Sequence, residues 1–203
     1  MNLILWILRR WGIAVGTLLL LGFPGVAARS AIQLSQGVSQ QREGNPATAA
    51  ERAFTEGDQL YQQGTAESLR QAIAKFEEAL KLYREVGNNG GQAISLLALG
   101  RIYSELGEKQ KALEYYNQSL SLSRAVADRG GEARTLNNIG LVYSELGEKQ
   151  KALEYYSQSL PLSRAVGDRI GEARTLNNIG LVYSELGEKQ KALEYYSQSL
   201  PLS

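Results

Sequence analysis

The chain of 203 residues contains no cysteine and no histidine. The absence of cysteine excludes a disulfide framework and a thiol nucleophile. The absence of histidine removes the imidazole that many general bases and most zinc sites use. We therefore expect no catalytic residue, no metal site and no cofactor, and we expect that the protein is not an enzyme.

The chain also lacks the excess of basic charge that suits nucleic acid. Three of its 22 basic residues, Arg9, Arg10 and Arg29, lie among the first 30 residues, which contain no acid. Residues 31–203 therefore hold 19 basic and 21 acidic side chains, a net charge of −2. A nucleic-acid partner would require a basic patch or stripe, so we expect none.

A secretory signal peptide is the prediction for residues 1–30. Two arginines precede an apolar run at residues 11–23, and a Pro–Gly break with small residues follows. This order is typical of a segment cleaved on export, which would place the protein in the periplasm or outside the cell. The run is shorter than the roughly 20 residues that span a bilayer. The alternative is an uncleaved N-terminal membrane anchor, because residues 1–8 are apolar as well.

The rest of the chain divides into a linker and a repeat. Residues 31–46 are rich in Gln, Ser and Gly without periodicity, which predicts a flexible linker. Residues 131–163 and 171–203 are then identical at all 33 positions, residues 91–123 are a divergent copy, and residues 47–86 are a weaker one. A fixed period of 40 residues indicates stacked structural units.

Each unit is predicted to be two antiparallel helices. In the unit that starts at residue 131, small and apolar residues recur at helical spacing in two stripes: Ala133, Leu136, Ile139, Gly140, Tyr143 and Leu146, then Ala152, Leu153, Tyr156 and Leu160. One pair cannot cover its own stripes, whereas stacked pairs can. The expected fold is all-α, an α-solenoid of antiparallel helix pairs. Its units are residues 47–87, 91–127, 131–167 and 171–203, the last one truncated.

The ends of the helices are predicted from capping residues. Asp128 should cap a first helix, and Gly147 should end it in a left-handed conformation. Ala127 stands where the next copy has a glycine, so the second helix before it should end less sharply. Pro161 and Pro201 fall within second helices, where the missing backbone donor should cause a kink.

The spacing within each unit resembles that of a known family. It is carried by Gly140, Tyr143, Gly147, Ala152, Tyr156 and Leu160, and by their equivalents 40 residues before and after. These residues resemble the tetratricopeptide repeat (TPR) over roughly residues 47–203. Leu136 replaces the usual tryptophan, and the small residue expected near the end of the second helix is Ser159. The 40-residue period resembles Pins-type and kinesin-light-chain repeats, and the TPR arrays of bacterial CHAT-domain proteins.

The resemblance implies a TPR superhelix that binds peptides or proteins along the concave surface of its first helices. The face opposite the core stripe, roughly 150° away at about 100° per residue, fits such a site. Asparagine is a poor helix former, whereas its amide offers a donor and an acceptor to an extended peptide. The predicted binding residues are Arg101, Arg134, Asn137, Asn138, Leu141, Arg174, Asn177, Asn178 and Leu181. Alternatively, these residues are a solvated face, or they bond to the neighbouring repeat.

The expected function is a non-catalytic scaffold that binds a protein or peptide of unknown identity. One alternative is the N-terminal regulatory repeat region of a longer CHAT-type protease, whose His–Cys dyad this chain lacks. The other is a structural spacer, or a chain that self-associates through its C-terminal repeat, because that repeat has no polar cap over its last apolar face.

Overall fold

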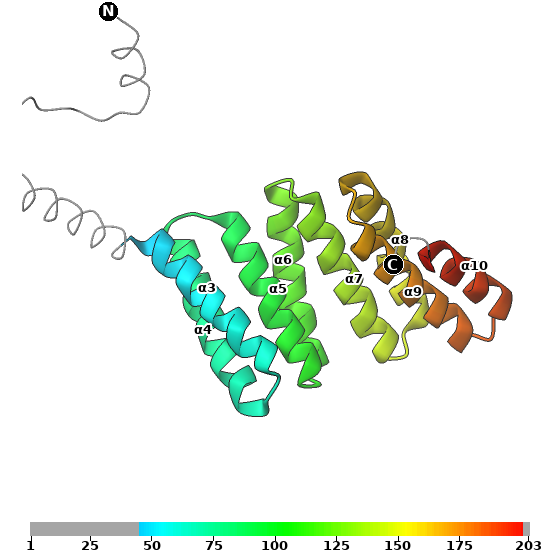
Figure 1. Cartoon of the computed structure of the whole chain (residues 1–203), viewed down its shortest axis with the longest axis horizontal. Helices are drawn as coiled ribbons and strands as arrows, with labels where there is room; N and C mark the ends of the chain where they lie inside the picture. Colours follow the sequence, from blue (N-terminus) through cyan, green and yellow to red (C-terminus); the bar gives the residue numbers. More distant parts are fainter. Residues whose placement is uncertain (1–44, 201–203) are drawn as a thin grey trace, which may run out of the picture. The chain divides into compact units, whose positions relative to one another are not determined.

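The structure, a computed structural model, describes residues 45–200. The predicted signal peptide and nearly all of the predicted linker lie outside the described residues. The described residues form eight helices and no strand (Figure 1): α3 (Pro46–Gln63), α4 (Ala66–Glu85), α5 (Asn89–Glu105), α6 (Lys109–Ala125), α7 (Arg129–Glu145), α8 (Lys149–Val166), α9 (Arg169–Glu185) and α10 (Lys189–Ser199). The predicted all-α class is confirmed.

The helices pack as pairs, and the pairs stack in chain order. α3 packs on α4, α5 on α6, α7 on α8 and α9 on α10, and each second helix contacts the first helix of the next pair. The first helices also touch one another, α5 with α7 and α7 with α9 (Figure 1). Because they approach so closely, the first helices line one side of the stack. The predicted solenoid of antiparallel helix pairs is therefore confirmed.

The core largely follows the predicted stripes. Five predicted core residues of the third unit are at most 1% exposed: Ala133, Leu136, Ile139, Ala152 and Tyr156. The prediction for Leu146 is wrong, because it lies in the turn after α7 and is 46% exposed. Val142 is fully buried instead. A first helix in a stack has neighbours on two sides, so a single stripe does not describe its buried surface.

Three of the four units have a close contact between a glycine of the first helix and a tyrosine of the second, and in the first unit Gly57 lies against Phe76 instead. A Cβ on Gly140 would lie 2.6 Å from the ring of Tyr156, and one on Gly100 would lie 2.5 Å from the ring of Tyr116. Real Cβ atoms do not approach so closely, so only glycine lets these two helices lie at this distance. Tyr116 and Tyr156 fill the space between the two helices and are almost fully buried.

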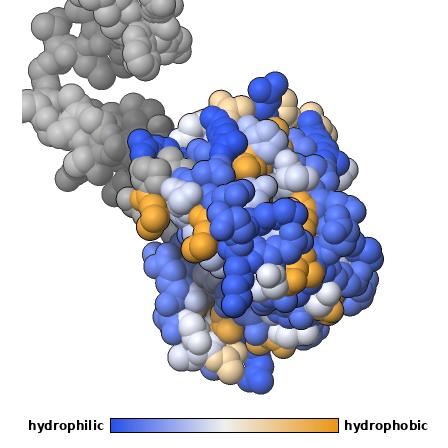
Figure 2. All heavy atoms as spheres, turned by 90° about the vertical axis from the view of Figure 1, so that its right-hand side faces the viewer, coloured by the Kyte–Doolittle hydropathy of each residue, from blue (hydrophilic) through white to orange (hydrophobic). Residues whose placement is uncertain are grey.

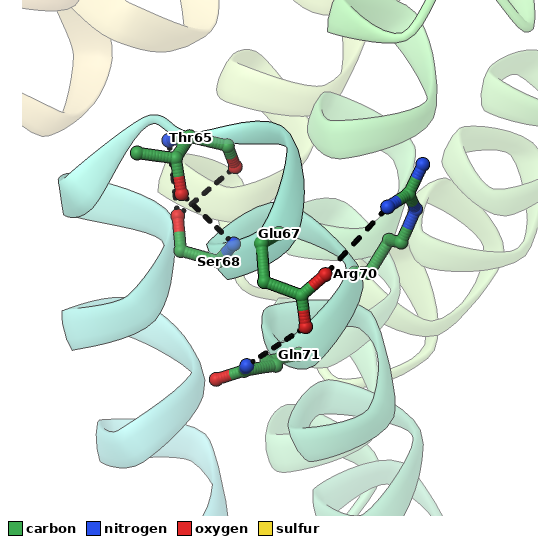
Figure 3. A network of polar contacts seen from close by, with 5 residues as sticks. All are labelled: Thr65, Glu67, Ser68, Arg70 and Gln71. Atoms are coloured by element: carbon green, nitrogen blue, oxygen red, sulfur yellow. Dashed lines mark hydrogen bonds and ion pairs between the residues drawn. The ribbon is translucent and has the colours of Figure 1, made fainter.

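Capping residues set the ends of the helices as the sequence predicts. The Asp128 carboxylate accepts a hydrogen bond from the Gly131 backbone N–H at 2.9 Å. Gly147 ends α7 with φ 78°, and Ala127 is the one non-glycine residue among the described residues with positive φ, at 56°. At the start of α4, Thr65 and Ser68 form a reciprocal capping box (Figure 3).

Pro161 does not interrupt its helix. α8 runs without a break from Lys149 to Val166 with Pro161 inside it. The proline removes one helical donor, and its side chain lies on the exposed face of α8, where water can satisfy the carbonyl left free. Pro201 lies outside the described residues.

Candidate peptide-binding groove

A groove of about 620 Å³ lies along the first helices α5, α7 and α9. Seven of the nine predicted binding residues line it: Arg101, Arg134, Asn137, Asn138, Leu141, Arg174 and Asn178. The other two, Asn177 and Leu181, do not line it and are exposed on α9. Six further residues complete the lining: Leu97, Ser104, Glu105, Lys109, Tyr116 and Glu145.

The side chain of Asn137 is buried and forms hydrogen bonds to the next unit. Its side chain is 5% exposed, and its Oδ1 accepts a hydrogen bond from the Asn178 amide at 3.1 Å. The same oxygen lies 3.2 Å from the hydroxyl of Thr175. Both partners belong to α9, so this asparagine joins two units, which is the alternative that the sequence left open.

Asn138 differs from its sequence equivalent Asn178. Asn178 bonds to Asn137 of the preceding unit, whereas the preceding unit offers Asn138 only the apolar Leu97 at that position. Asn138 is half-buried, and no hydrogen bond of its side chain occurs within residues 45–200. Its amide therefore keeps a donor and an acceptor for a ligand in the groove.

The two carboxylates that line the groove already have partners inside the protein. Glu145 of α7 forms an ion pair with Lys109 at the start of α6. Glu105 of α5 accepts a hydrogen bond from the hydroxyl of Tyr61. The charge of Glu145 is therefore compensated by Lys109, whereas Glu105 keeps its charge and is held in place by the hydrogen bond from Tyr61.

Two arginines of the groove have no such partner. Arg134 and Arg174 are exposed and lie 40 residues apart, at equivalent positions of α7 and α9. Neither forms a hydrogen bond or ion pair with its side chain among the described residues. Guanidinium groups in this state favour carboxylate or phosphate groups of a ligand. The uncompensated charge of the groove is therefore positive, although residues 31–203 carry a net charge of −2.

A polar cluster occupies the α3–α5 end of the groove. Arg101 donates to the Tyr61 hydroxyl at 2.9 Å, and its guanidinium lies 4.8 Å from the centre of the same ring. Burial, and then the hydrogen bond to Glu105, raise the pKa of Tyr61 above its usual value. The tyrosine stays neutral and holds Arg101 in place, so Arg101 is less available to a ligand than Arg134.

Sequence reasoning missed Lys109, Tyr116 and Glu105. Lys109 belongs to a second helix, and it reaches the groove because its ammonium extends toward Glu145 of the next unit. Tyr116 was assigned to the core, where it lies almost fully buried, and it also lines the groove. Glu105 follows Arg101 by one helical turn, as Glu145 follows Leu141. Helical spacing along the face opposite the core could therefore have predicted Glu105.

Two further kinds of feature do not occur among residues 45–200. No group of three or more acidic side chains there is arranged to hold a metal ion. No helix in this part of the chain is long and apolar enough to cross a membrane.

A stack of helix pairs with a groove along its first helices defines the class of helical-repeat proteins. The chain belongs to the tetratricopeptide repeat family, whose model matches residues 61–125, 113–165 and 131–203. No curated protein matches the chain. The predicted relation to CHAT-domain proteins stays a prediction.

Solved structures share the fold. Aspartyl phosphate phosphatase F from Bacillus subtilis has a TM-score of 0.71 and 19% identity, and the match covers 77% of this chain but only 40% of that one. BtubC from P. vanneervenii has a TM-score of 0.70 and 20% identity, over 86% of this chain and 72% of that one. The TPR domain of Arabidopsis FLU has a TM-score of 0.51 and 25% identity, over 54% and 92%.

Proposed function

We propose that the chain is a non-catalytic scaffold that binds an extended, acidic segment of a partner protein along the groove of α5, α7 and α9. One observation carries the proposal: the acids of the groove are bonded internally, while Arg134 and Arg174 are not. A carboxylate-bearing segment would neutralise both arginines, and the Asn138 amide would hydrogen-bond its backbone.

The apolar part of the groove supports an extended segment with mixed side chains. Leu97 and Leu141, both half-buried, line the groove together with Asn138. An apolar side chain of the partner could cover these leucines while its acids reach the arginines. Affinity would then depend on both contacts, and the acidic part would weaken as salt screens it.

The test is the affinity for an acidic, fluorescently labelled peptide, compared with a neutral peptide of the same length in which every acid is an amide. We expect Arg134→Ala with Arg174→Ala to weaken binding of the acidic peptide by about tenfold or more, because charge-assisted hydrogen bonds contribute about 1.5–3 kcal/mol. The neutral peptide should bind the parent and the variant alike.

The matched control removes two positive charges elsewhere. Arg129 and Lys81 are exposed and lie outside the groove, so Arg129→Ala with Lys81→Ala changes the net charge equally. Equal loss with the control pair would mean that only net charge matters. Equal affinity for the acidic and neutral peptides would contradict the proposal and favour the spacer alternative.

Two predictions from the sequence, export and a link to a CHAT-type protease, are independent of this proposal and stay predictions. Export of the protein depends on residues 1–30, which lie outside the described residues. Regulation of a CHAT-type protease domain would be one use of the same groove, and the peptide experiment applies to it unchanged.

A further inference from the structure

The two unpaired arginines of the groove belong to a row of equivalent positions, one in each first helix. Arg134 of α7 and Arg174 of α9 are 40 residues apart, and Ile94 of α5 holds the same position one unit earlier. Ile94 is half-buried, whereas both arginines are exposed. Leu97, one helical turn after Ile94, lines the groove. From α5 to α9 the row is therefore apolar, basic and basic.

The charges at the α5 end of the groove compensate one another. Tyr61 accepts a hydrogen bond from Arg101 and donates one to Glu105, so it holds both charged side chains together. By contrast, Arg134 and Arg174 have no partner among the described residues. The positive charge that a ligand meets is therefore concentrated at α7 and α9, and an acid of the ligand is better placed there than beside Glu105.

The α10 end of the stack has no such order of charges that an occupant could be matched to. Figure 2 views the stack from this end, where hydrophobic patches lie between hydrophilic side chains. Nothing among residues 45–200 indicates what would cover those patches. The groove is therefore the surface to which a ligand of stated chemistry can be assigned.

Helix packing sets the spacing of the row. α5 contacts α7, and α7 contacts α9, and helices in contact lie about 8–10 Å apart. Equivalent residues of neighbouring first helices therefore follow one another at about 8–10 Å along the groove. A partner that uses both arginines must present its acids on one side at this distance.

The possible conformations of a bound segment differ in this distance. A β-strand places side chains on one side every two residues, about 6.6 Å apart. A polyproline II helix has three residues per turn and a rise of 3.1 Å, so its side chains return to one side after about 9.3 Å. An α-helix comes near the spacing only with acids seven residues apart, at about 10.5 Å. Of the two extended conformations, polyproline II is the one that matches the stack.

We propose that the groove is specific for a polyproline II segment of the partner protein that carries two acids three residues apart. An apolar residue stands three residues before or after this pair. The acids pair with Arg134 and Arg174, and the apolar side chain covers Ile94 and Leu97. Because polyproline II forms no internal hydrogen bonds, the carbonyls of the segment are free to accept from the Asn138 amide. This proposal rests on the proposed function, since it assigns the conformation and spacing of the acidic segment.

The test compares labelled proline-rich peptides of one composition by fluorescence anisotropy with the full chain. The matching peptide has a leucine, a glutamate three residues later and a second glutamate three residues after the first, with prolines between. In the shifted peptide the second glutamate follows the first by two residues. We expect the shifted peptide to bind about tenfold more weakly, about 1.4 kcal/mol, because one arginine loses its partner. Arg174→Ala should weaken the matching peptide by a similar factor and leave the shifted peptide nearly unchanged.

A second variant tests the spacing by adding an arginine to the row. Ile94→Arg places a guanidinium at the equivalent position of α5. A peptide with a third glutamate in place of the leucine should bind this variant about tenfold more tightly than it binds the parent protein. Ser121→Arg is the matched control, because Ser121 is exposed on α6 and outside the groove. An equal gain with the control would show that net charge alone acts and would overturn the proposal.

The outcomes separate this proposal from the proposed function. If the matching and shifted peptides bind equally, and Arg134→Ala with Arg174→Ala weakens both, the acidic groove stands and the polyproline II spacing is wrong. If the two substitutions weaken neither peptide, both proposals are wrong. Tighter binding of an alanine-rich peptide with acids seven residues apart would replace polyproline II by an α-helix. The shifted peptide tests the parent protein itself, so this comparison does not depend on the folding of any variant.

Discussion

The side-chain amide of Asn178 donates a hydrogen bond to the side-chain oxygen of Asn137, 3.1 Å away across the boundary between two units. This contact changes the interpretation of the two adjacent asparagines in α7. In α7, Asn137 bonds to the next unit although it also lines the groove, whereas Asn138 lines the groove without a hydrogen bond of its side chain among the described residues. A sequence motif that suggested one binding surface therefore divides into a structural residue and a residue free to bind.

The hydrogen bond between Asn137 and Asn178 should contribute to the free energy of unfolding. Replacing Asn137 by alanine leaves the Asn178 amide without its acceptor, so we expect a loss of about 1–3 kcal/mol in the free energy of unfolding. Asn177→Ala changes the sequence-equivalent residue, which is exposed and accepts only from Ser199, and should cost less than about 0.5 kcal/mol. Urea unfolding of the two variants measures the difference. Equal losses would show that the bond between units contributes nothing.

The contact of Gly140 with Tyr156 should tolerate no added methyl group. Because a Cβ would lie 2.6 Å from the tyrosine ring, Gly140→Ala must separate α7 from α8, and we expect a loss of about 1–3 kcal/mol. Gly130→Ala is the control, since its Cβ would lie 3.5 Å from the nearest atom, in Asp128. That variant should be neutral or slightly more stable, because alanine favours helix over glycine. Thermal unfolding followed by circular dichroism compares them.

Replacing Ala127 in the turn before α7 by glycine should stabilise the protein. Ala127 adopts a φ of 56°, a left-handed conformation that costs a residue with a Cβ roughly 1–2 kcal/mol. We expect Ala127→Gly to raise the free energy of unfolding by about 0.5–1 kcal/mol, the remainder being lost to the greater freedom of glycine in the unfolded chain. The converse substitution, Gly167→Ala in the next unit, should lower it. A stabilising effect of Gly167→Ala in the same assay would contradict this account.

Alkaline pH should destabilise the stack through its buried tyrosines. Burial raises the pKa of Tyr156 far above the usual value of a tyrosine, about 10, so above pH 10 the folded chain keeps a proton that the unfolded chain loses. The free energy of unfolding should be unaffected below about pH 9 and should fall above pH 10, by up to about 1.4 kcal/mol per pH unit for each such group.

Tyr156→Phe tests this assignment. The variant cannot ionise at this position, so it should show a shallower loss of stability above pH 10. At pH 7 its stability should stay close to that of the parent, because the Tyr156 hydroxyl forms no hydrogen bond among the described residues. A parallel series of urea unfolding curves at different pH values provides the comparison. An unchanged slope would assign the alkaline loss to other groups.

Much of the fold could be predicted from local rules. The period of 40 residues gave the units, glycine and aspartate gave the helix ends, and helical spacing gave most of the core. The rule of a single buried stripe failed for Leu146 and Val142, because helices in a stack are covered from two sides. The same rule assigns Asn137 only to the groove, which it does line, and does not account for its hydrogen bonds to α9. Seven of the nine predicted binding residues line the groove, since a face opposite the core is a local property of one helix.

The sequence by itself determined the helix pairs, their stacking and the side of the first helices that lines the groove, because these follow from periodicity and capping within each unit. Only the tertiary structure distinguished residues that are identical in sequence. Asn137 and Asn177 occupy the same position in identical segments, yet one is 5% exposed and the other is open to solvent. Burial depends on the neighbouring unit, and α9 covers the first of these asparagines whereas no described helix covers the second.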